Sequence, residues 1–341
     1  MKSETVHLLL GADSAYFEGL RASVLTALIS MKGERPCRVT VLDCGLTSEQ
    51  IERLKKEFDL VAARRSSATD MSFIVPSLEQ LRDLPGFGAQ KSLAAYARIL
   101  APELLPDSEV IWIDADFIVL EDLSQITSQV DRACLVGGVV DSKIRTIEND
   151  PATVREGVRD RRYLNSGLLW MNLEQLRAEN FPAEALRFME ANKERLIYAD
   201  QGPINALTQD RRCYLPESLN RQIFETTALG DILSWIGQGN LHFAGRIKPW
   251  LNTSRPDLLA QVVVFHRLLD KLGLGAGESR FQMLKNPPSK QRALYSFWIA
   301  RLRRNKRKIK RAKLLLDTLA QEDLLSERID DLFCSRDSGN F

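Results

Sequence analysis

Histidine is scarce in this chain, with three among 341 residues, so a metal site would depend mainly on carboxylates. The five cysteines are odd in number and scattered, without a C-x-x-C pair. This argues against a zinc cluster or a secreted disulfide framework, and a reducing cytosol is the simplest location. No apolar run approaches the roughly eighteen residues of a membrane-spanning helix. The first apolar run, residues 6–10, is also too short for a signal sequence.

Charge is nearly balanced overall, at a net +2, but it is distributed unevenly. Segment 301–313 (RLRRNKRKIKRAK) is almost entirely basic and lies within a long helical pattern over 291–325. A basic amphipathic helix favours an anionic membrane surface, where each basic residue adds about 1 kcal/mol. Nucleic acid and a solvated helix face are the alternatives, although no base-reading module is present. The apolar residues at helical spacing are Trp298, Leu302, Ile309, Leu316 and Leu319.

The first half of the chain alternates short β-branched runs with helical patterns, which indicates βαβ units and an α/β fold with a mainly parallel sheet. Beyond about Pro256 the strand patterns cease, and Pro287-Pro288 marks a hinge or linker. We therefore expect an α/β domain over 1–255 and a helical region over 256–341. The expected strands are 6–10, 38–42 and 110–113, and the expected helices are 17–31, 47–58 and 93–104.

The acidic turn Asp114-Ala115-Asp116 directly follows the expected buried strand 110–113. Two carboxylates so close together repel each other unless a cation separates them, and a divalent cation bound to a diphosphate is one such partner. An ordinary solvated turn is the alternative. Ligands of parallel α/β sheets bind at the carboxyl ends of strands, so Gly11-Ala12-Asp13 is expected beside the acidic turn.

Segment 241–250 (LHFAGRIKPW) supplies a second set of candidates. His242 is a candidate third metal ligand, Gly245 lets the backbone approach phosphate closely, and Lys248 provides a positive charge. A mixture of carboxylate and imidazole ligands suits Mn²⁺ better than Mg²⁺, which prefers oxygen. The alternative is a histidine that is hydrogen-bonded beside a turn.

Two further polar segments follow. Asn165 and Ser166 precede a buried apolar run, and Asp200-Gln201-Gly202 opens a short helical pattern. Their amide and carboxylate groups are suited to sugar hydroxyls. An Asx turn at Asn165 and a helix N-cap at Asp200 are the structural alternatives.

The order of these elements resembles the family-8 retaining glycosyltransferases, especially the bacterial enzymes that extend lipopolysaccharide with galactose or glucose. The resemblance extends from about Val6 to Trp250, and H-x-x-G-x-x-K-P-W is its most distinctive part. It implies a GT-A fold, a Rossmann-like mostly parallel sheet flanked by helices, here with a helical C-terminal extension. It also implies a UDP-sugar donor, Mn²⁺ with Mg²⁺ as the alternative, a saccharide or lipid-linked saccharide acceptor, and no nucleic acid. The expected location is cytoplasmic, peripheral on the inner face of the plasma membrane.

The resemblance assigns roles residue by residue. The metal ligands are Asp114, Asp116 and His242; the nucleotide and diphosphate positions are Gly11, Ala12, Asp13, Tyr16, Arg98, Ala115, Gly245 and Lys248; and the positions around the donor sugar are Asp141, Asn165, Asp200 and Gln201.

Three positions depart from the family pattern, and they leave the sugar and the acceptor open. Gly202 replaces a frequent second aspartate, Ser166 replaces a frequent alanine, and Ala15 replaces a polar nucleotide contact. A covalent intermediate would need a nucleophile near the anomeric carbon; Gln201 is a poor one, and Asp141 and Asp200 are better on chemical grounds. We favour front-face substitution over this alternative. A sugar-nucleotide pyrophosphorylase ranks lower because the loop after the first strand, GADS, is acidic and poor in glycine. A non-catalytic relative is the third alternative.

Overall fold

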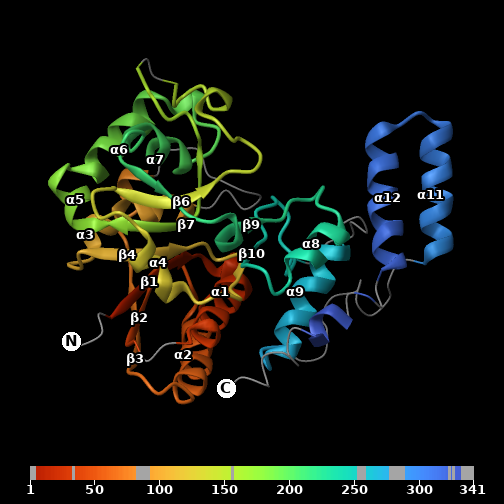
Figure 1. The fold of residues 1–341 in the computed structure, drawn as a ribbon, viewed down its shortest axis with the longest axis horizontal. Coiled ribbons are helices and arrows are strands. Elements are labelled where there is room, and N and C mark those ends of the chain that lie inside the picture. Colours follow the sequence, from red (N-terminus) through yellow and green to blue (C-terminus); the bar gives the residue numbers. More distant parts are fainter. Residues whose placement is uncertain are drawn as a thin grey trace. The chain divides into compact units, whose positions relative to one another are not determined.

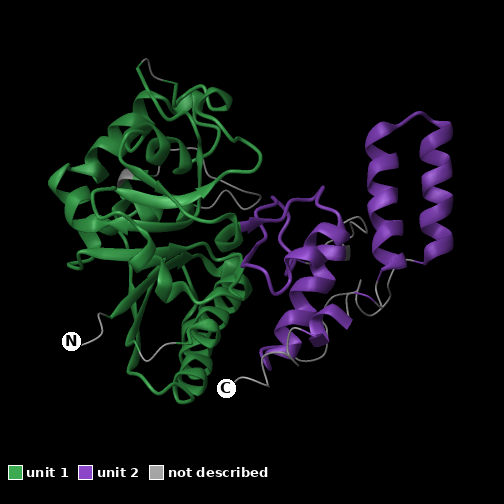
Figure 2. Cartoon of the chain, in the orientation of Figure 1, with its two compact units in different colours: residues 1–220 green, residues 221–341 purple. Residues whose placement is uncertain are grey.

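A computed structural model of the chain describes residues 5–32, 35–81, 93–154, 157–251, 259–275, 289–321, 324 and 327–331. The chain forms two compact units, residues 1–220 and residues 221–341 (Figure 2). Each unit is described separately below. The catalytic domain that we expect over 1–255 stays a prediction, because unit 1 ends at Asn220.

Unit 1 is built on a seven-stranded sheet of order β3-β2-β1-β4-β7-β6-β8 (Figure 1). The pairs β1–β2, β1–β4, β2–β3 and β6–β8 are parallel, whereas β7 runs antiparallel to β4 and β6. The expected mostly parallel sheet is therefore confirmed. The strands are β1 (Val6–Ala12), β2 (Cys37–Asp43), β3 (Thr69–Ile74), β4 (Glu109–Ile113), β6 (Val136–Val140), β7 (Leu164–Asn172) and β8 (Arg212–Tyr214), and the short β5 (Phe117–Ile118) follows the acidic turn.

Helices cover both faces of this sheet (Figure 1). On one side lie α1 (Phe17–Ser30) and α2 (Ser48–Ala62). On the other lie α5 (Leu173–Ala178), α6 (Phe181–Ala191) and α7 (Gln201–Leu207), with the short α3 (Ala101–Leu104) beside α5. The core on this second side includes Tyr96, Trp112, Leu169, Phe181 and Met189. The short helix α4 (Ile126–Gln129) precedes β6.

The local patterns predict most of these elements correctly. The three expected strands correspond to β1, β2 and β4, and the helices over 17–31 and 47–58 correspond to α1 and α2. Thr47 caps α2 in a full capping box with Gln50, as a threonine followed three residues later by glutamine predicts. The segment 93–104 differs: residues Ala94–Leu100 form a 3₁₀ helix and only Ala101–Leu104 is α-helical. Pro102, near the start of α3, has no N–H to continue the preceding turn.

Unit 2 begins with the parallel pair of β9 (Arg221–Gln222) and β10 (Leu241–His242), and helices and turns make up the rest of its described residues. Its helices are α8 (Leu229–Trp235), α9 (Leu259–Lys271), α11 (Lys290–Leu302) and α12 (Lys306–Ala320). Pro287-Pro288 lies outside the described residues. No helix in the described ranges is long and apolar enough to cross a bilayer.

The single long helix expected over 291–325 is wrong. The chain turns at residues 303–305, so α11 and α12 form a helical hairpin (Figure 1). Arg304 has a left-handed φ of 51°, which ends the first helix, and the side chain of Asn305 accepts a hydrogen bond from the N–H of Lys308 at the start of the second.

The cysteines also differ from expectation, because Cys134 and Cys213 form a disulfide across 79 residues of sequence. Cys134 lies just before β6 and Cys213 lies in β8. The parallel pairing of these two strands brings the cysteines together, with Cα atoms 6.0 Å apart. Their sequence separation gave no sign of this pairing.

We expect reduction of this disulfide to lower the free energy of unfolding by up to about 4 kcal/mol, since a long closed loop restricts the unfolded chain. Urea denaturation with and without dithiothreitol measures the difference. The control is the Cys134→Ser/Cys213→Ser variant, which keeps the thiols of Cys37 and Cys44 and should not respond to reductant. Equal unfolding midpoints for the oxidised and reduced wild-type protein would contradict the prediction.

Candidate active site

The acidic turn of unit 1 is held in place by hydroxyl groups of α1. The Ser23 hydroxyl lies 3.1 Å from the carbonyls of both Asp114 and Phe117, and it accepts the N–H of Phe117 at 2.9 Å. One turn later, Thr26 accepts the N–H of Val119 at 3.0 Å. Buried hydroxyls in a helix interior need such partners. They explain why α1 has polar residues on a buried face, and they fix the backbone that presents the two aspartates.

Strand β7 completes the same edge of the sheet. Because β7 is antiparallel to β4, its beginning lies beside the end of β4, and the N–H of Asp114 donates to the carbonyl of Gly167 at 2.8 Å. The end of β1 is also adjacent, since β1 pairs directly with β4. The expectation that the acidic turn and Gly11-Ala12-Asp13 share one edge therefore agrees with the sheet order.

Arg98 connects three parts of this edge. Its side chain is 3% exposed and lies over the ring of Trp112, with the guanidinium carbon 4.6 Å from the ring centroid. Nη2 is 2.7 Å from Oδ1 of Asp114, and Nη1 donates to the carbonyl of Ser166. The Trp112 indole N–H donates to the same Asp114 oxygen at 2.9 Å. The orientation of the Asp114 carboxylate is thus fixed by one hydrogen bond and one ion pair.

Asp200 is the second acidic partner of Arg98, with Nε and Oδ2 3.0 Å apart. The Nε–H points toward the carbonyl of Ala95 instead, so this contact is an ion pair without hydrogen-bond geometry. Burial raises the pKa of Asp200 to about 6, against the opposing effect of Arg98 and with a further rise from Asp114. Asp200 occupies the N-cap position of α7 but makes no side-chain capping bond. The simple N-cap interpretation is therefore wrong.

Asp141, Asn165 and Gln201 form one buried hydrogen-bonded group. Oδ2 of Asp141 accepts from the Asn165 amide at 3.0 Å and from the Gln201 amide at 3.2 Å. Its Oδ1 accepts the backbone N–H groups of Lys143 and Ile144. The Gln201 oxygen in turn accepts the N–H of Ser166 at 2.9 Å. All four predicted sugar positions therefore lie within connected networks of unit 1.

The segment expected to hold the nucleotide has a clear structural role as well. A Cβ on Gly11 would lie 3.0 Å from Cη2 of Trp112, so glycine allows the close packing at this position. Ala12 is buried, and Asp13 accepts the N–H groups of Ala15 and Tyr16, which caps a 3₁₀ turn. These contacts fix the backbone of the turn at the end of β1.

Two residues that the sequence did not single out support the site. Asn205 accepts the N–H of Leu164 and donates to the carbonyls of Leu164 and Gln201, which ties α7 to the start of β7. Its place four residues after Gln201, on the same side of α7, was the available signal. Arg212 donates to the Asn205 oxygen at 2.9 Å and completes the connection to β8.

Gly202 has an unexpected carboxylate beside it. A Cβ on Gly202 would lie 3.4 Å from Oδ2 of Asp150, a residue that is 1% exposed. The same oxygen accepts the phenol of Tyr163 at 2.7 Å, and burial raises the pKa of Asp150. An aspartate at position 202 would place a second carboxylate against the buried carboxylate of Asp150, and the two would repel each other. Glycine at this position avoids that repulsion.

In unit 2, segment 241–250 consists of β10 and the turns that follow it. His242 is buried, and its carbonyl accepts the N–H groups of Ile223 and Ala244. A Cβ on Gly245 would lie 3.1 Å from the Glu225 carboxylate, which accepts the next N–H, that of Arg246. Lys248 is also buried, and its amine donates to the carbonyl of Phe243 at 2.9 Å.

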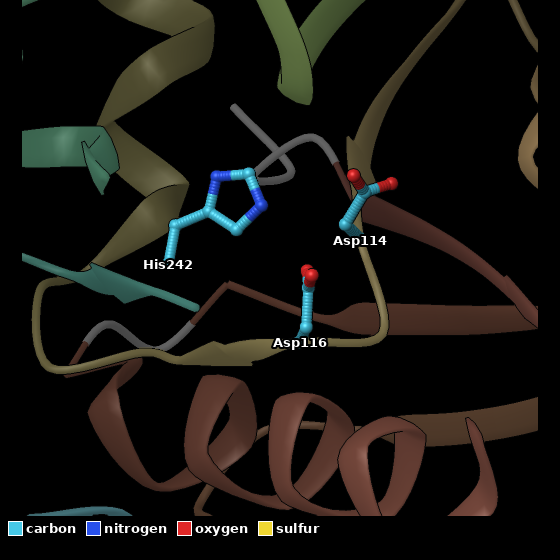
Figure 3. A group of neighbouring side chains, drawn as sticks. All are labelled: Asp114, Asp116 and His242. Carbon is cyan, nitrogen blue, oxygen red and sulfur yellow. The ribbon is translucent and has the colours of Figure 1, made fainter. Parts of the chain in front are cut away.

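Asp114, Asp116 and His242 each offer one ligand atom, and these atoms lie within 4.8 Å of one another (Figure 3). Asp116 and Ala115 of the turn are each 6% exposed, whereas the Asp114 side chain is 24% exposed. The described residues thus contain the three-ligand group that the sequence predicts.

Comparison with known proteins identifies the family of this chain. The family model described as glycosyl transferase family 8 matches residues 7–254. The chain belongs to glycosyltransferase family 8. Membership excludes the pyrophosphorylase alternative and identifies the protein as a glycosyltransferase. The sequence resemblance is thereby confirmed.

Individual relatives of this family-8 glycosyltransferase are distant. General stress protein A of Bacillus subtilis is 26% identical over 276 residues, 75% of this chain and 91% of that protein. The galactosyltransferase LgtC, solved with donor and acceptor sugar analogues, has a TM-score of 0.62 at 20% identity and covers 81% of this chain and 98% of its own. The bifunctional glycosyltransferase WbbM has a TM-score of 0.56 at 19% identity, covering 73% and 47%. The structures confirm the GT-A-type fold.

The raised pKa of Asp200 predicts a pH dependence of stability. An unfolded aspartate has a pKa of about 3.9, so the folded protein binds this proton more tightly. Stability should therefore fall as pH rises from about 4 through about 6, by about 1.4 kcal/mol per unit of pKa difference. Asp200→Asn should remove this part of the pH dependence.

Urea unfolding of wild type and Asp200→Asn at about pH 4.5 and about pH 7.5 measures the difference. Asp210→Asn, a change at an exposed aspartate, is the matched control and should keep the wild-type profile. Identical pH profiles for wild type and Asp200→Asn would show that Asp200 titrates in its ordinary range.

Proposed function

We propose that this protein transfers a hexose, galactose or glucose, from a UDP-sugar to a saccharide acceptor with retention of anomeric configuration, in the presence of Mn²⁺. The observation that carries the proposal is the group formed by Asp114, Asp116 and His242, together with the buried polar networks of Arg98 and Asp141. Family membership supplies the reaction class. The acceptor that we propose is a lipopolysaccharide or another cell-surface glycan.

The residues present fit a divalent metal ion. Two carboxylates and one imidazole leave coordination positions for diphosphate oxygens, and this mixed donor set suits Mn²⁺, with Mg²⁺ as the alternative. Trp112 donates to Oδ1 of Asp114, and Arg98 forms an ion pair with the same oxygen, so the two hold this carboxylate in one orientation. When bound, the metal ion supplies Lewis-acid stabilisation of the leaving diphosphate.

Several groups are proposed to hold the donor. Gly11, Ala12, Asp13 and Tyr16 would contact the nucleoside, and Gly245 and Lys248 would contact the diphosphate. The Lys248 amine is hydrogen-bonded to the Phe243 carbonyl. In this proposal its positive charge stabilises the negative charge of the leaving UDP. Arg98 acts through Asp114 as a positioning residue.

The donor sugar is proposed to lie against Asp141, Asn165, Asp200 and Gln201. Asp141 accepts four hydrogen bonds from protein groups, which stabilise its charge and reduce its nucleophilicity. Gln201 has a neutral amide. We therefore favour front-face substitution: the acceptor oxygen bonds to the anomeric carbon as the bond to phosphate breaks, and the acceptor proton passes to the departing phosphate oxygen.

A UDP-release assay tests the donor. It compares UDP-Glc, UDP-Gal, UDP-GlcNAc and UDP-GalNAc, each with and without Mn²⁺. Turnover is expected with a hexose donor and only with metal. Asp116→Asn should reduce kcat by about two orders of magnitude or more because it removes a charged ligand. Asp210→Asn serves as the matched surface control. Turnover without metal, or none with any UDP-sugar, would overturn the proposal.

The hairpin of α11 and α12 is proposed to hold the protein on the anionic inner face of the plasma membrane. On α11, Leu294, Trp298 and Leu302 recur every four residues and are 41%, 55% and 78% exposed, and Tyr295 is 71% exposed. The first half of α12 carries the basic run. An apolar face beside a cationic one is typical of interfacial helices.

Replacing two of these apolar side chains, as in Trp298→Ser/Leu302→Ser, should weaken binding to vesicles that contain phosphatidylglycerol by about tenfold or more. Vesicle co-sedimentation of the full chain measures this. Leu60→Ser is the matched control, since Leu60 is 60% exposed on α2, in unit 1. Equal binding by wild type and the double variant would rule out this mode of attachment.

A further inference from the structure

A cavity of about 570 Å³ lies within unit 2, apart from the groups assigned above. One wall is the first half of α12, and the opposite wall comes from two short segments, residues 225–226 and 246–247. Its size is that of a small-molecule site. All of its lining residues belong to unit 2, and none is among those proposed to hold the donor, although segment 246–247 lies between Gly245 and Lys248 in the sequence.

Five of the nine residues that line the cavity are basic. Four basic residues of α12 line the cavity: Lys306, Arg307, Lys310 and Arg311. Their spacing of one, three and four residues places them on one side of the helix. Arg246 adds a fifth cation from the opposite wall. The cavity therefore gathers cations from two separate parts of the chain.

The acidic residue in the lining, Glu225, accepts hydrogen bonds from the backbone of segment 246–247. Its Oε1 accepts the N–H of Arg246 at 2.6 Å and the N–H of Ile247 at 3.3 Å. This carboxylate therefore shapes the turn that presents Arg246, and one negative charge faces five positive ones. A lining with five cationic side chains and one carboxylate favours an anionic ligand.

Helix α12 differs in charge pattern from an ordinary surface helix of the same protein. The first turn of α2 contains the acidic Glu49, as the positive end of the helix dipole favours. The first turn of α12 contains no acidic residue and begins with Lys306, Arg307 and Lys308. These cations oppose the dipole, so local helix stability does not explain their placement.

The lining also indicates the class of anion. Arginine forks bind phosphate oxygens in pairs, and lysines add point charges. Ile247 and Leu314 provide apolar surface beside the cations, suited to the organic part of an ester. None of the lining residues is aromatic, so the cavity lacks the stacking surface of a single-stranded nucleic-acid site.

We propose that this cavity binds a phosphate-ester group, either of a soluble sugar phosphate or glycerol phosphate or of a phospholipid headgroup. Its lining residues differ from those proposed to hold the donor and from the apolar residues of α11.

The test uses the full-length protein and glycerol 3-phosphate as the probe, with glycerol as the uncharged reference, in isothermal titration calorimetry without Mn²⁺. Wild type should bind glycerol 3-phosphate and not glycerol. Lys306→Gln/Lys310→Gln should weaken binding by roughly tenfold or more. The matched control is Lys308→Gln/Lys313→Gln, which removes the same charge from the same helix outside the cavity lining and should stay within about twofold.

No binding by wild type, or an equal loss in both double variants, would overturn the proposal. Thermal melts confirm that both variants are folded. Vesicles of phosphatidylcholine with phosphatidic acid then identify the source of the phosphate. A cavity-specific loss of vesicle binding supports a lipid headgroup, and a loss confined to glycerol 3-phosphate supports a soluble ester. The assay involves no sugar transfer, so failure of the proposed activity does not affect it.

Discussion

The guanidinium of Arg98 is the interaction on which the geometry of unit 1 depends. It is buried against Trp112 and contacts the Asp114 carboxylate, the Ser166 carbonyl and Asp200. These groups come from β4, β7 and the start of α7, three elements far apart in sequence. One buried cation between two carboxylates keeps both acidic groups in place, and removal of Arg98 would leave the buried carboxylate of Asp200 without this cation. Lysine would lack the planar fork that reaches all three.

The polar groups around the proposed sugar site are already hydrogen-bonded to one another. Asp141 accepts from Asn165 and Gln201, and Asn205 joins Gln201 to Leu164. Such a connected network holds its side chains rigid before a ligand arrives. A rigid site loses less conformational freedom on binding. It also means that a sugar hydroxyl must exchange with, or add to, existing bonds, which ties sugar selectivity to the geometry of the whole network.

The sequence predicted what local chemistry determines. Apolar periodicity located β1, β2, β4, α1 and α2, and Thr47 marked the start of α2. It did not predict the break at Arg304, because a left-handed arginine carries no composition signal. It did not predict the Cys134–Cys213 pair, because that contact depends on strand pairing between β6 and β8. Asn205 was missed for the same reason: its partners are backbone atoms of a strand about forty residues away.

The ordered motifs were more informative than any single one. Asp114-Ala115-Asp116 alone was compatible with a solvated turn, and Asp200 alone with a helix cap. In the fold, Asp114 contacts Arg98, and the Asp200 side chain makes no capping hydrogen bond. The motifs did not predict that the carboxylate of Asp150, from a separate loop, lies beside Gly202.

The disulfide divides unit 1 in an informative way. Residues 134–213 form a covalent ring that contains Asp141, Asn165, Asp200 and Gln201, whereas Arg98 and the acidic turn lie outside it. A peptide bond cut within the ring would leave both fragments attached, so the cut would become visible only on a reducing gel. During synthesis, the ring cannot close until Cys213 has left the ribosome. The residues proposed to face the sugar are thus joined into one topological loop only after the turn proposed to hold the metal has been made.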